Sequence, residues 1–243
     1  MLMSNADLDF RVTKDIDIVL ILEALNVDFY RAFWNYVELA NYEHRNKSTG
    51  SPQFFRFSHP KSDEFPMMIE LFTRRTDNIE LPDTARLTPL PIDEDVSSLS
   101  AILLDDDYYD FLKYGTVQVD GLSILDAVHL IPFKAKAWLD LSKKRSDGEI
   151  IDKRAIKKHC NDLFRLSVLL NSEEEPLVFF PDTIRNDMLA FIEKMKTEEI
   201  DLKQLGLRQT KKSILLDRLK AIYTASPEMI QRNTNRIDLD FTL

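Results

Sequence analysis

Hydrophobic and polar residues alternate in short segments over the first half of the chain. Residues 15–22 alternate acid and isoleucine and then continue as an apolar run, which predicts a strand that enters the core. Residues 53–57 and 65–72 predict two strands of a hairpin or ribbon with a long polar loop, and residues 86–92 predict a short edge strand. A DG dipeptide between β-prone residues predicts a further hairpin over 117–124.

Helical spacing is the exception in this half and the rule in the second. Residues 26–41 predict an amphipathic helix, and residues 95–104 predict a short one. After residue 125 four segments have a helical pattern: 126–144, 152–170, 181–196 and 210–223. Pro132 is predicted to interrupt the first of them, because proline lacks the N–H that a helix interior requires.

The separation of strands from helices predicts an α+β fold. We expect an α+β domain over residues 1–125, with a mixed sheet and flanking helices, and a helical domain over residues 126–243. The segment 234–243 alternates in hydropathy, which fits either an added strand or a disordered end.

Composition excludes several classes of protein. With 32 Lys+Arg against 41 Asp+Glu, the net charge of −9 argues against a surface that is basic throughout, as many nucleic-acid-binding proteins have. The five glycines are not clustered, which excludes Walker-type and Rossmann phosphate loops. The single cysteine, Cys160, excludes an internal disulfide and fits a reducing, cytoplasmic compartment, and we expect it to be a small hydrophobe on a helix. No signal peptide or membrane-spanning run is visible, so no membrane partner is expected.

Three carboxylates are the strongest chemical signal. Asp15 and Asp17 are spaced to share one face of a strand, where their charges repel unless a cation lies between them. Glu70 interrupts an apolar run on another predicted strand and is the candidate for a third ligand of a two-metal site. The alternative is that the aspartates lie on a solvated face and Glu70 on the open face of an edge strand.

Two segments make the chain resemble a known family. The RVTKDIDIVL segment is similar to the metal-binding strand of nucleotidyltransferases related to DNA polymerase β, in particular the AbiEii-like nucleotidyltransferases that act as bacterial toxins. The segment LIPFKAKAWLDLSKKRSDGEIIDKRAIKKHCNDLFRL resembles that family's second signature, whose acid matches Asp162. The resemblance covers about residues 1–170 and implies a nucleotidyltransferase-like sheet in the N-terminal domain.

The resemblance also implies roles for individual residues. Asp15 and Asp17 match the metal ligands of the family, with Glu70 as the less clearly matched third carboxylate. Lys134 matches the lysine that reaches the nucleotide phosphates, with Lys136 as its substitute, and a solvated helix lysine is the alternative. The implied cofactor is Mg²⁺ or Mn²⁺, and the implied substrates are an NTP and a tRNA or protein hydroxyl. A separate antitoxin is the implied partner.

One departure from the family concerns nucleotide binding. The family has a Gly-Gly or Gly-Ser pair roughly ten to fifteen residues before the two aspartates, where backbone N–H groups approach the triphosphate. Here residues 1–11 contain no glycine, and Ser4 is the nearest replacement. We therefore expect either that the start of the chain is cut short or that tight nucleotide binding has been lost.

Basic residues outnumber acidic ones over residues 134–165. On helices they could form a positive wall suited to a triphosphate or an RNA backbone, although a solvated helix surface explains them equally well. His129 and His159 are isolated from other metal-ligand residue types and fit surface or core positions.

Three hypotheses follow from the sequence. The main one is an AbiEii-like, Mg²⁺-dependent nucleotidyltransferase. The alternative is a catalytically degenerate binding module that keeps the fold and acts through protein contacts. A transferase that modifies a small molecule such as an antibiotic is the third, and the sequence does not separate it from an enzyme that modifies RNA.

Overall fold

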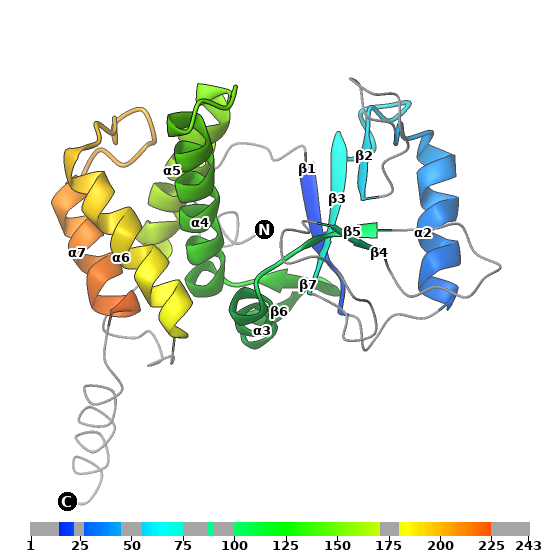
Figure 1. Ribbon diagram of the computed structural model, residues 1–243, viewed down its shortest axis with the longest axis horizontal. Helices are drawn as coiled ribbons and strands as arrows, with labels where there is room; N and C mark the ends of the chain where they lie inside the picture. The colour runs from blue at the N-terminus through cyan, green and yellow to red at the C-terminus, as the bar shows by residue number, and fades with distance from the viewer. Residues whose placement is uncertain are drawn as a thin grey trace, which may run out of the picture. The chain divides into compact units, whose positions relative to one another are not determined.

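The chain forms two compact units in a computed structural model that describes residues 15–21, 27–44, 55–74, 87–89, 100–170 and 180–224. The sheet unit spans Arg11–Tyr109, and the helical unit continues from Asp110 (Figure 1). Helices and small mixed sheets are both present, which confirms the α+β class. A domain boundary at residue 125 stays a prediction, and Ser4 and residues 234–243 lie outside the described residues.

The sheet unit is built on a five-stranded mixed sheet, in which four strands have the order β1-β3-β5-β4 and β2 pairs with β3 off this path. β1 (Asp15–Val19) and β5 (Ser100–Leu103) pair in parallel with β3 (Met68–Thr73). β2 (Arg56–Ser58) is antiparallel to β3, and β4 (Leu87–Pro89) is antiparallel to β5. β3 is therefore paired with three other strands, β1, β2 and β5. Its antiparallel pairing with β2 confirms the predicted pairing of the segments 53–57 and 65–72.

The helix predicted over residues 95–104 is wrong for the part that the structure describes, because residues 100–103 form β5. This apolar segment is short, and its hydropathy does not distinguish a buried strand from a helical turn. β5 pairs with β3 on one side and with β4 on the other. These hydrogen bonds to distant segments decide its conformation.

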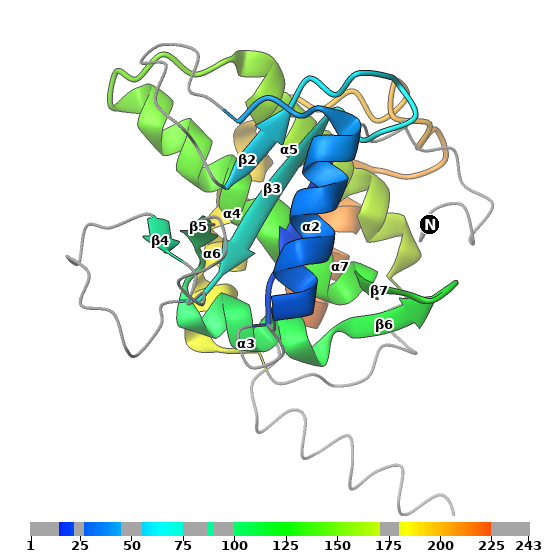
Figure 2. The same cartoon turned by 90° about the vertical axis from the view of Figure 1, so that its right-hand side faces the viewer.

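Alternation along β1 and β3 gives the sheet one apolar face. Leu20, Ile69 and Leu71 are buried there with Phe33 and Val37 of α2 (Val27–Ala40). Figure 2 shows α2 lying along this face of the sheet. Successive side chains on a strand point to opposite faces, so the residues between these apolar ones are turned to the other face. Asp15, Asp17 and Glu70 are among them.

The helical unit follows α3 (Asp106–Tyr114), which spans the division between the units. A β-hairpin comes first, and its turn uses Asp120 (φ 51°) and Gly121 (φ 78°) as the DG signal predicts. The hairpin consists of β6 (Thr116–Val119) and β7 (Leu122–Leu125). The helical unit then continues with α4 (Ala127–Ser146), α5 (Lys153–Leu166), the 3₁₀ turn η2 (Ser167–Leu169), α6 (Asp182–Thr197) and α7 (Lys212–Tyr223). The four helices predicted after residue 125 are confirmed.

Pro132 does not interrupt α4, contrary to the prediction, because the hydrogen bond that it cannot make is replaced. A proline at 132 leaves the carbonyl of Val128, one turn earlier, without its helical N–H donor. The hydroxyl of Tyr223 on α7 donates to this buried oxygen at 2.6 Å. A contact between distant segments thus preserves a helix that would be predicted to end at Pro132 from the local sequence.

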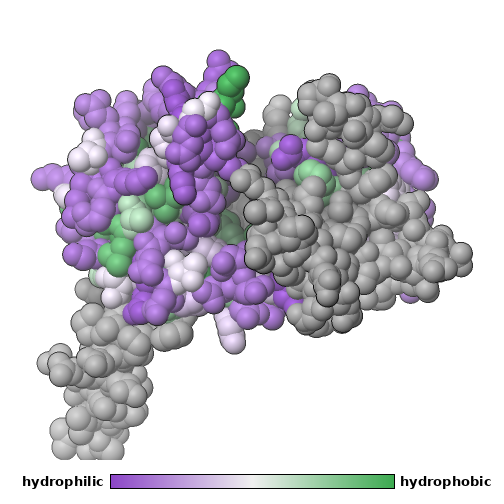
Figure 3. Space-filling model, viewed as in Figure 1, coloured by the Kyte–Doolittle hydropathy of each residue, from purple (hydrophilic) through white to green (hydrophobic). Residues whose placement is uncertain are grey.

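The surface of the helical unit is mostly hydrophilic in the view of Figure 3, with apolar side chains in small separate groups. Among the described residues, no helix is both long enough and apolar enough to cross a membrane.

Candidate functional site

The sheet unit brings the predicted carboxylates onto neighbouring strands. Asp17 on β1 is in register with Glu70 on β3, and Asp15 is in register with Met68. Because registered residues of paired strands point to the same face, Asp15, Asp17 and Glu70 share the face opposite α2. Asp17 is exposed, Asp15 is half-buried, and the side chain of Glu70 is 14% exposed.

An arginine that the sequence analysis missed neutralises Glu70. Arg56 on β2 is in register with Glu70, and its Nε donates to Oε1 at 2.6 Å. Its Nη2 lies 2.6 Å from the same oxygen. The alternating FRFS segment on a predicted strand was the available signal, but only the register between β2 and β3 identifies the acid that Arg56 meets.

The donor chemistry of this face suits a hard divalent cation, since Mg²⁺ prefers carboxylate oxygens. Asp15 and Asp17 are the residues that could hold it. In the part of the chain that the structure describes, however, no group of three or more His, Cys, Asp or Glu side chains is placed to hold a metal. Glu70 is turned toward Arg56, so the third ligand requires this ion pair to open.

The remaining predicted residues lie on the helical unit. Lys134 is half-buried on α4 and takes part in an interaction. Lys136 is engaged by two acids, with Nζ 3.5 Å from Asp140 and 3.4 Å from Asp187. Burial lowers the pKa of Lys136, but the two carboxylates outweigh it and the net shift is upward. Lys136 is thus engaged in ion pairs, and the phosphate contacts that the resemblance implies for Lys134 and Lys136 stay predictions.

Asp162 is buried within α5. It is 2% exposed, and its Oδ1 lies 3.8 Å from Nη1 of Arg165, one turn later. A buried carboxylate is costly without a partner, and Arg165 provides a charged one. The catalytic role that the resemblance implies for Asp162 stays a prediction.

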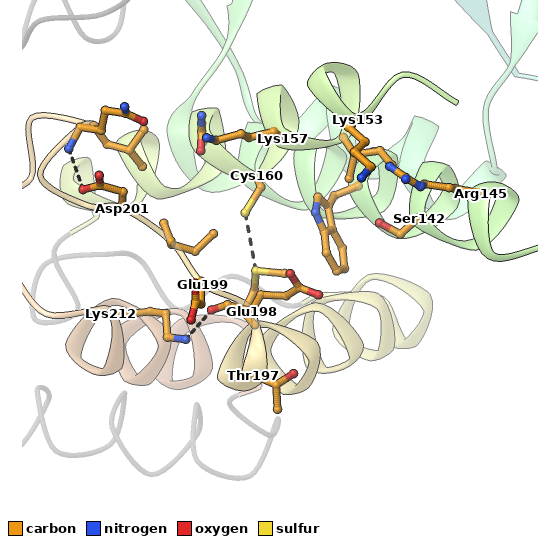
Figure 4. A pocket seen from close by; sticks show the side chains of 17 residues that line it. Ser142, Arg145, Lys153, Lys157, Cys160, Thr197, Glu198, Glu199, Asp201 and Lys212 are labelled. Atoms are coloured by element: carbon orange, nitrogen blue, oxygen red, sulfur yellow. Dashed lines mark hydrogen bonds between the residues drawn. The ribbon is translucent and has the colours of Figure 1, made fainter. Parts of the chain in front are cut away.

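The helical unit contains a cavity of about 870 Å³, within the usual range of ligand sites (Figure 4). Its floor is apolar and includes Trp138, Ile156 and Met195. The ring of Trp138 is fixed edge-on to Phe191, with centroids 5.4 Å apart, and has Nζ of Lys194 5.9 Å from its centroid. Helix packing therefore gives the cavity a rigid base.

Lys212 holds the loop that closes the cavity after α6. Its Nζ donates to the backbone carbonyls of Lys196 at 3.2 Å and Glu198 at 2.7 Å, which are otherwise unpaired groups at the end of a helix.

Cys160 lies at the base of the cavity, 2% exposed, with its Sγ 3.6 Å from Sδ of Met195. Burial raises the pKa of its thiol to about 12, and the nearby Glu198 adds to this while Lys212 opposes it. Cys160 is thus a small hydrophobe on a helix, as predicted, and is not a reactive thiol.

In comparisons with protein-family models, curated proteins and solved structures, the chain matches none. The resemblance to AbiEii-like nucleotidyltransferases therefore rests on the two segments of the sequence and stays a prediction.

Proposed function

We propose that the chain is a Mg²⁺-dependent nucleotidyltransferase, which transfers a nucleotide from an NTP to a hydroxyl acceptor. The observation that carries the proposal is the register of β1 with β3, which sets Asp17 beside Glu70 on the face that also carries Asp15. Like charges on adjacent strands are unfavourable unless a cation is present. The segment that carries Asp15 and Asp17 is also the one that resembles the metal-binding strand of the family.

The proposed chemistry assigns each residue a task. Asp15 and Asp17 would hold the ion, which when bound supplies the positive charge that stabilises the phosphates and the acceptor oxygen. Lys134, which lies on the helical unit, is assigned to the triphosphate by the resemblance alone. The acceptor oxygen forms a bond to the α-phosphorus, pyrophosphate leaves, and the hydroxyl proton passes to water. A tRNA or protein hydroxyl as acceptor, and a cognate antitoxin as partner, are part of the proposal by resemblance alone.

Neutralising the two aspartates tests this proposal. In the D15N/D17N variant, NTP binding in the presence of Mg²⁺ should weaken at least about tenfold, because each lost charge removes a metal ligand. Isothermal titration calorimetry with each NTP, with and without Mg²⁺, measures the change. D63N/E64Q is the matched control, since it removes two exposed charges from the same unit. Equal NTP affinity in the wild type and D15N/D17N would contradict the proposal.

The Arg56–Glu70 ion pair favours the second candidate, a degenerate binding module without catalysis. With one carboxylate oxygen held at 2.6 Å by a guanidinium, the face already carries an internal cation. Such a face needs no metal to balance Glu70, and it leaves two aspartates as ligands. A protein that has lost its metal could keep this arrangement for stability alone.

Removing the guanidinium separates the two candidates. If the face binds a metal, the R56Q variant frees Glu70 as a ligand and Mg²⁺-dependent NTP binding should tighten about tenfold. R31Q is the matched control, because Arg31 is an exposed arginine of α2 in the same unit, 3.8 Å from Asp28. Calorimetry showing no Mg²⁺-dependent binding in either the wild type or R56Q would favour the binding module.

A further inference from the structure

The cavity of the helical unit has walls of opposite charge. Arg145, at the end of α4, and Lys153 and Lys157, in the first turns of α5, line one side. Glu198 and Glu199, directly after α6, line the other. Figure 4 shows the three basic side chains along one side of the cavity and the two carboxylates across from them. We call these the basic wall and the acidic wall.

The two walls do not neutralise each other. Among the described residues no ion pair joins the basic wall to the acidic wall, and none of the five side chains has another charged partner. Other acids and bases on the same helices do pair, as Lys196 does with Glu193 at 2.6 Å. Opposite charges that line one cavity and stay apart leave both walls available to a ligand that carries both kinds of group.

The packing around the acidic wall keeps it in place. Lys212 donates to the backbone carbonyls of Lys196 and Glu198, and these hydrogen bonds hold the backbone of the segment that carries both glutamates. Asp201 accepts a hydrogen bond from the backbone N–H of Gln204 at 3.1 Å and so caps the next turn. The loop is therefore preorganised, and preorganisation reduces the entropy that a ligand must lose on binding.

We propose that this cavity binds a nucleoside monophosphate whose base carries an exocyclic amino group. The phosphate lies against the basic wall, where guanidinium and ammonium groups form charge-assisted hydrogen bonds. The amino group donates to the acidic wall, as the amino group of cytosine does to Glu or Asp in nucleic-acid recognition. The apolar floor covers the base. This site lies wholly in the helical unit, needs no metal, and is independent of the proposed nucleotidyltransferase face.

The comparison of CMP with UMP tests the proposal. The two ligands differ where CMP has an amino donor and UMP has a carbonyl acceptor, which a carboxylate repels. Titration calorimetry without divalent metal should show that CMP binds about tenfold more tightly than UMP. Cytidine, which lacks the phosphate, should bind at least about tenfold more weakly than CMP.

Variants of each wall test its part. K153Q/K157Q should weaken the binding of CMP at least about tenfold, because the two side chains of α5 that donate to the phosphate lose their charge. K143Q/R154Q is the matched control, since it removes two exposed charges from the same helices outside the cavity, and it should leave CMP affinity unchanged. E198Q/E199Q should reduce the preference for CMP over UMP to about twofold or less.

Three results would overturn the site. The first is equal affinity for CMP and UMP. The second is an equal loss of CMP affinity in K153Q/K157Q and K143Q/R154Q, and the third is no CMP binding at millimolar concentration. Failure of the proposed nucleotidyltransferase is a separate result, because D15N/D17N should leave metal-independent CMP binding unchanged. If D15N/D17N removes CMP binding, the ligand occupies the sheet unit and the inferred cavity site is wrong.

Discussion

Replacing Gly115 by alanine is expected to lower the free energy of unfolding by roughly 3 kcal/mol. Gly115 joins α3 to the β6–β7 hairpin and is buried, and a methyl group added there would fall on the ring of His129. The ring cannot easily yield. Its Nδ1 lies 2.8 Å from Oδ1 of Asp126, and its centroid is 4.4 Å from that of Phe111. Urea unfolding followed by circular dichroism measures the loss.

Gly148→Ala is the control for this substitution. Gly148 has φ 95° and open space around its missing side chain, so alanine there adds backbone strain of about 1 kcal/mol without a clash. The free energy lost at Gly115 should therefore be clearly larger. Equal losses at the two positions would show that the contact with His129 does not constrain this part of the helical unit.

Replacing Tyr223 by phenylalanine is expected to cost about 2 kcal/mol, because it leaves the carbonyl of Val128 buried without a donor. Pro132 cannot supply the helical N–H, and the Tyr223 hydroxyl is the donor that the structure provides at 2.6 Å. The ring itself stays, with its centroid 4.9 Å from that of Phe180, so the loss reports the hydrogen bond. Thermal and urea unfolding of Y223F measure it.

A double-mutant cycle with P132A isolates the cause. In P132A the new alanine N–H can bond the carbonyl of Val128, so the further change Y223F should cost about 1 kcal/mol less than it does in the wild type. The pair is useful because α4 carries both Lys134 and part of the cavity. Additive effects of the two substitutions would mean that the hydroxyl does not replace the missing helical hydrogen bond.

The sequence predicted those parts of the fold that local patterns determine. The hairpin with Asp120 and Gly121 follows from turn chemistry, and the helices after residue 125 follow from their hydrophobic period. β5 was missed because its pairing with β3 and β4 outweighs its own weak preference. The continuity of α4 at Pro132 depends on Tyr223, 91 residues away, and no local rule includes such a partner.

The candidate site likewise has features that can be predicted from the sequence and features that cannot. The spacing of Asp15 and Asp17 is visible in the sequence, since two residues on a strand share a face whatever surrounds them. The partner of Glu70 is not visible, because Arg56 reaches it only through the register of β2 with β3. The two walls of the cavity come from α4, α5 and the segment after α6, and hydrophobic periods do not specify which helix faces meet.

Manganese binding tests the central claim most directly, because it needs neither the nucleotide nor the acceptor. Mn²⁺ replaces Mg²⁺ at carboxylate sites, and electron paramagnetic resonance counts the free ion during a titration. The account predicts that the wild type and D63N/E64Q bind Mn²⁺ alike, and that D15N/D17N binds it at least about tenfold more weakly. Equal Mn²⁺ binding by the wild type and D15N/D17N would contradict the claim that these two aspartates form a metal site.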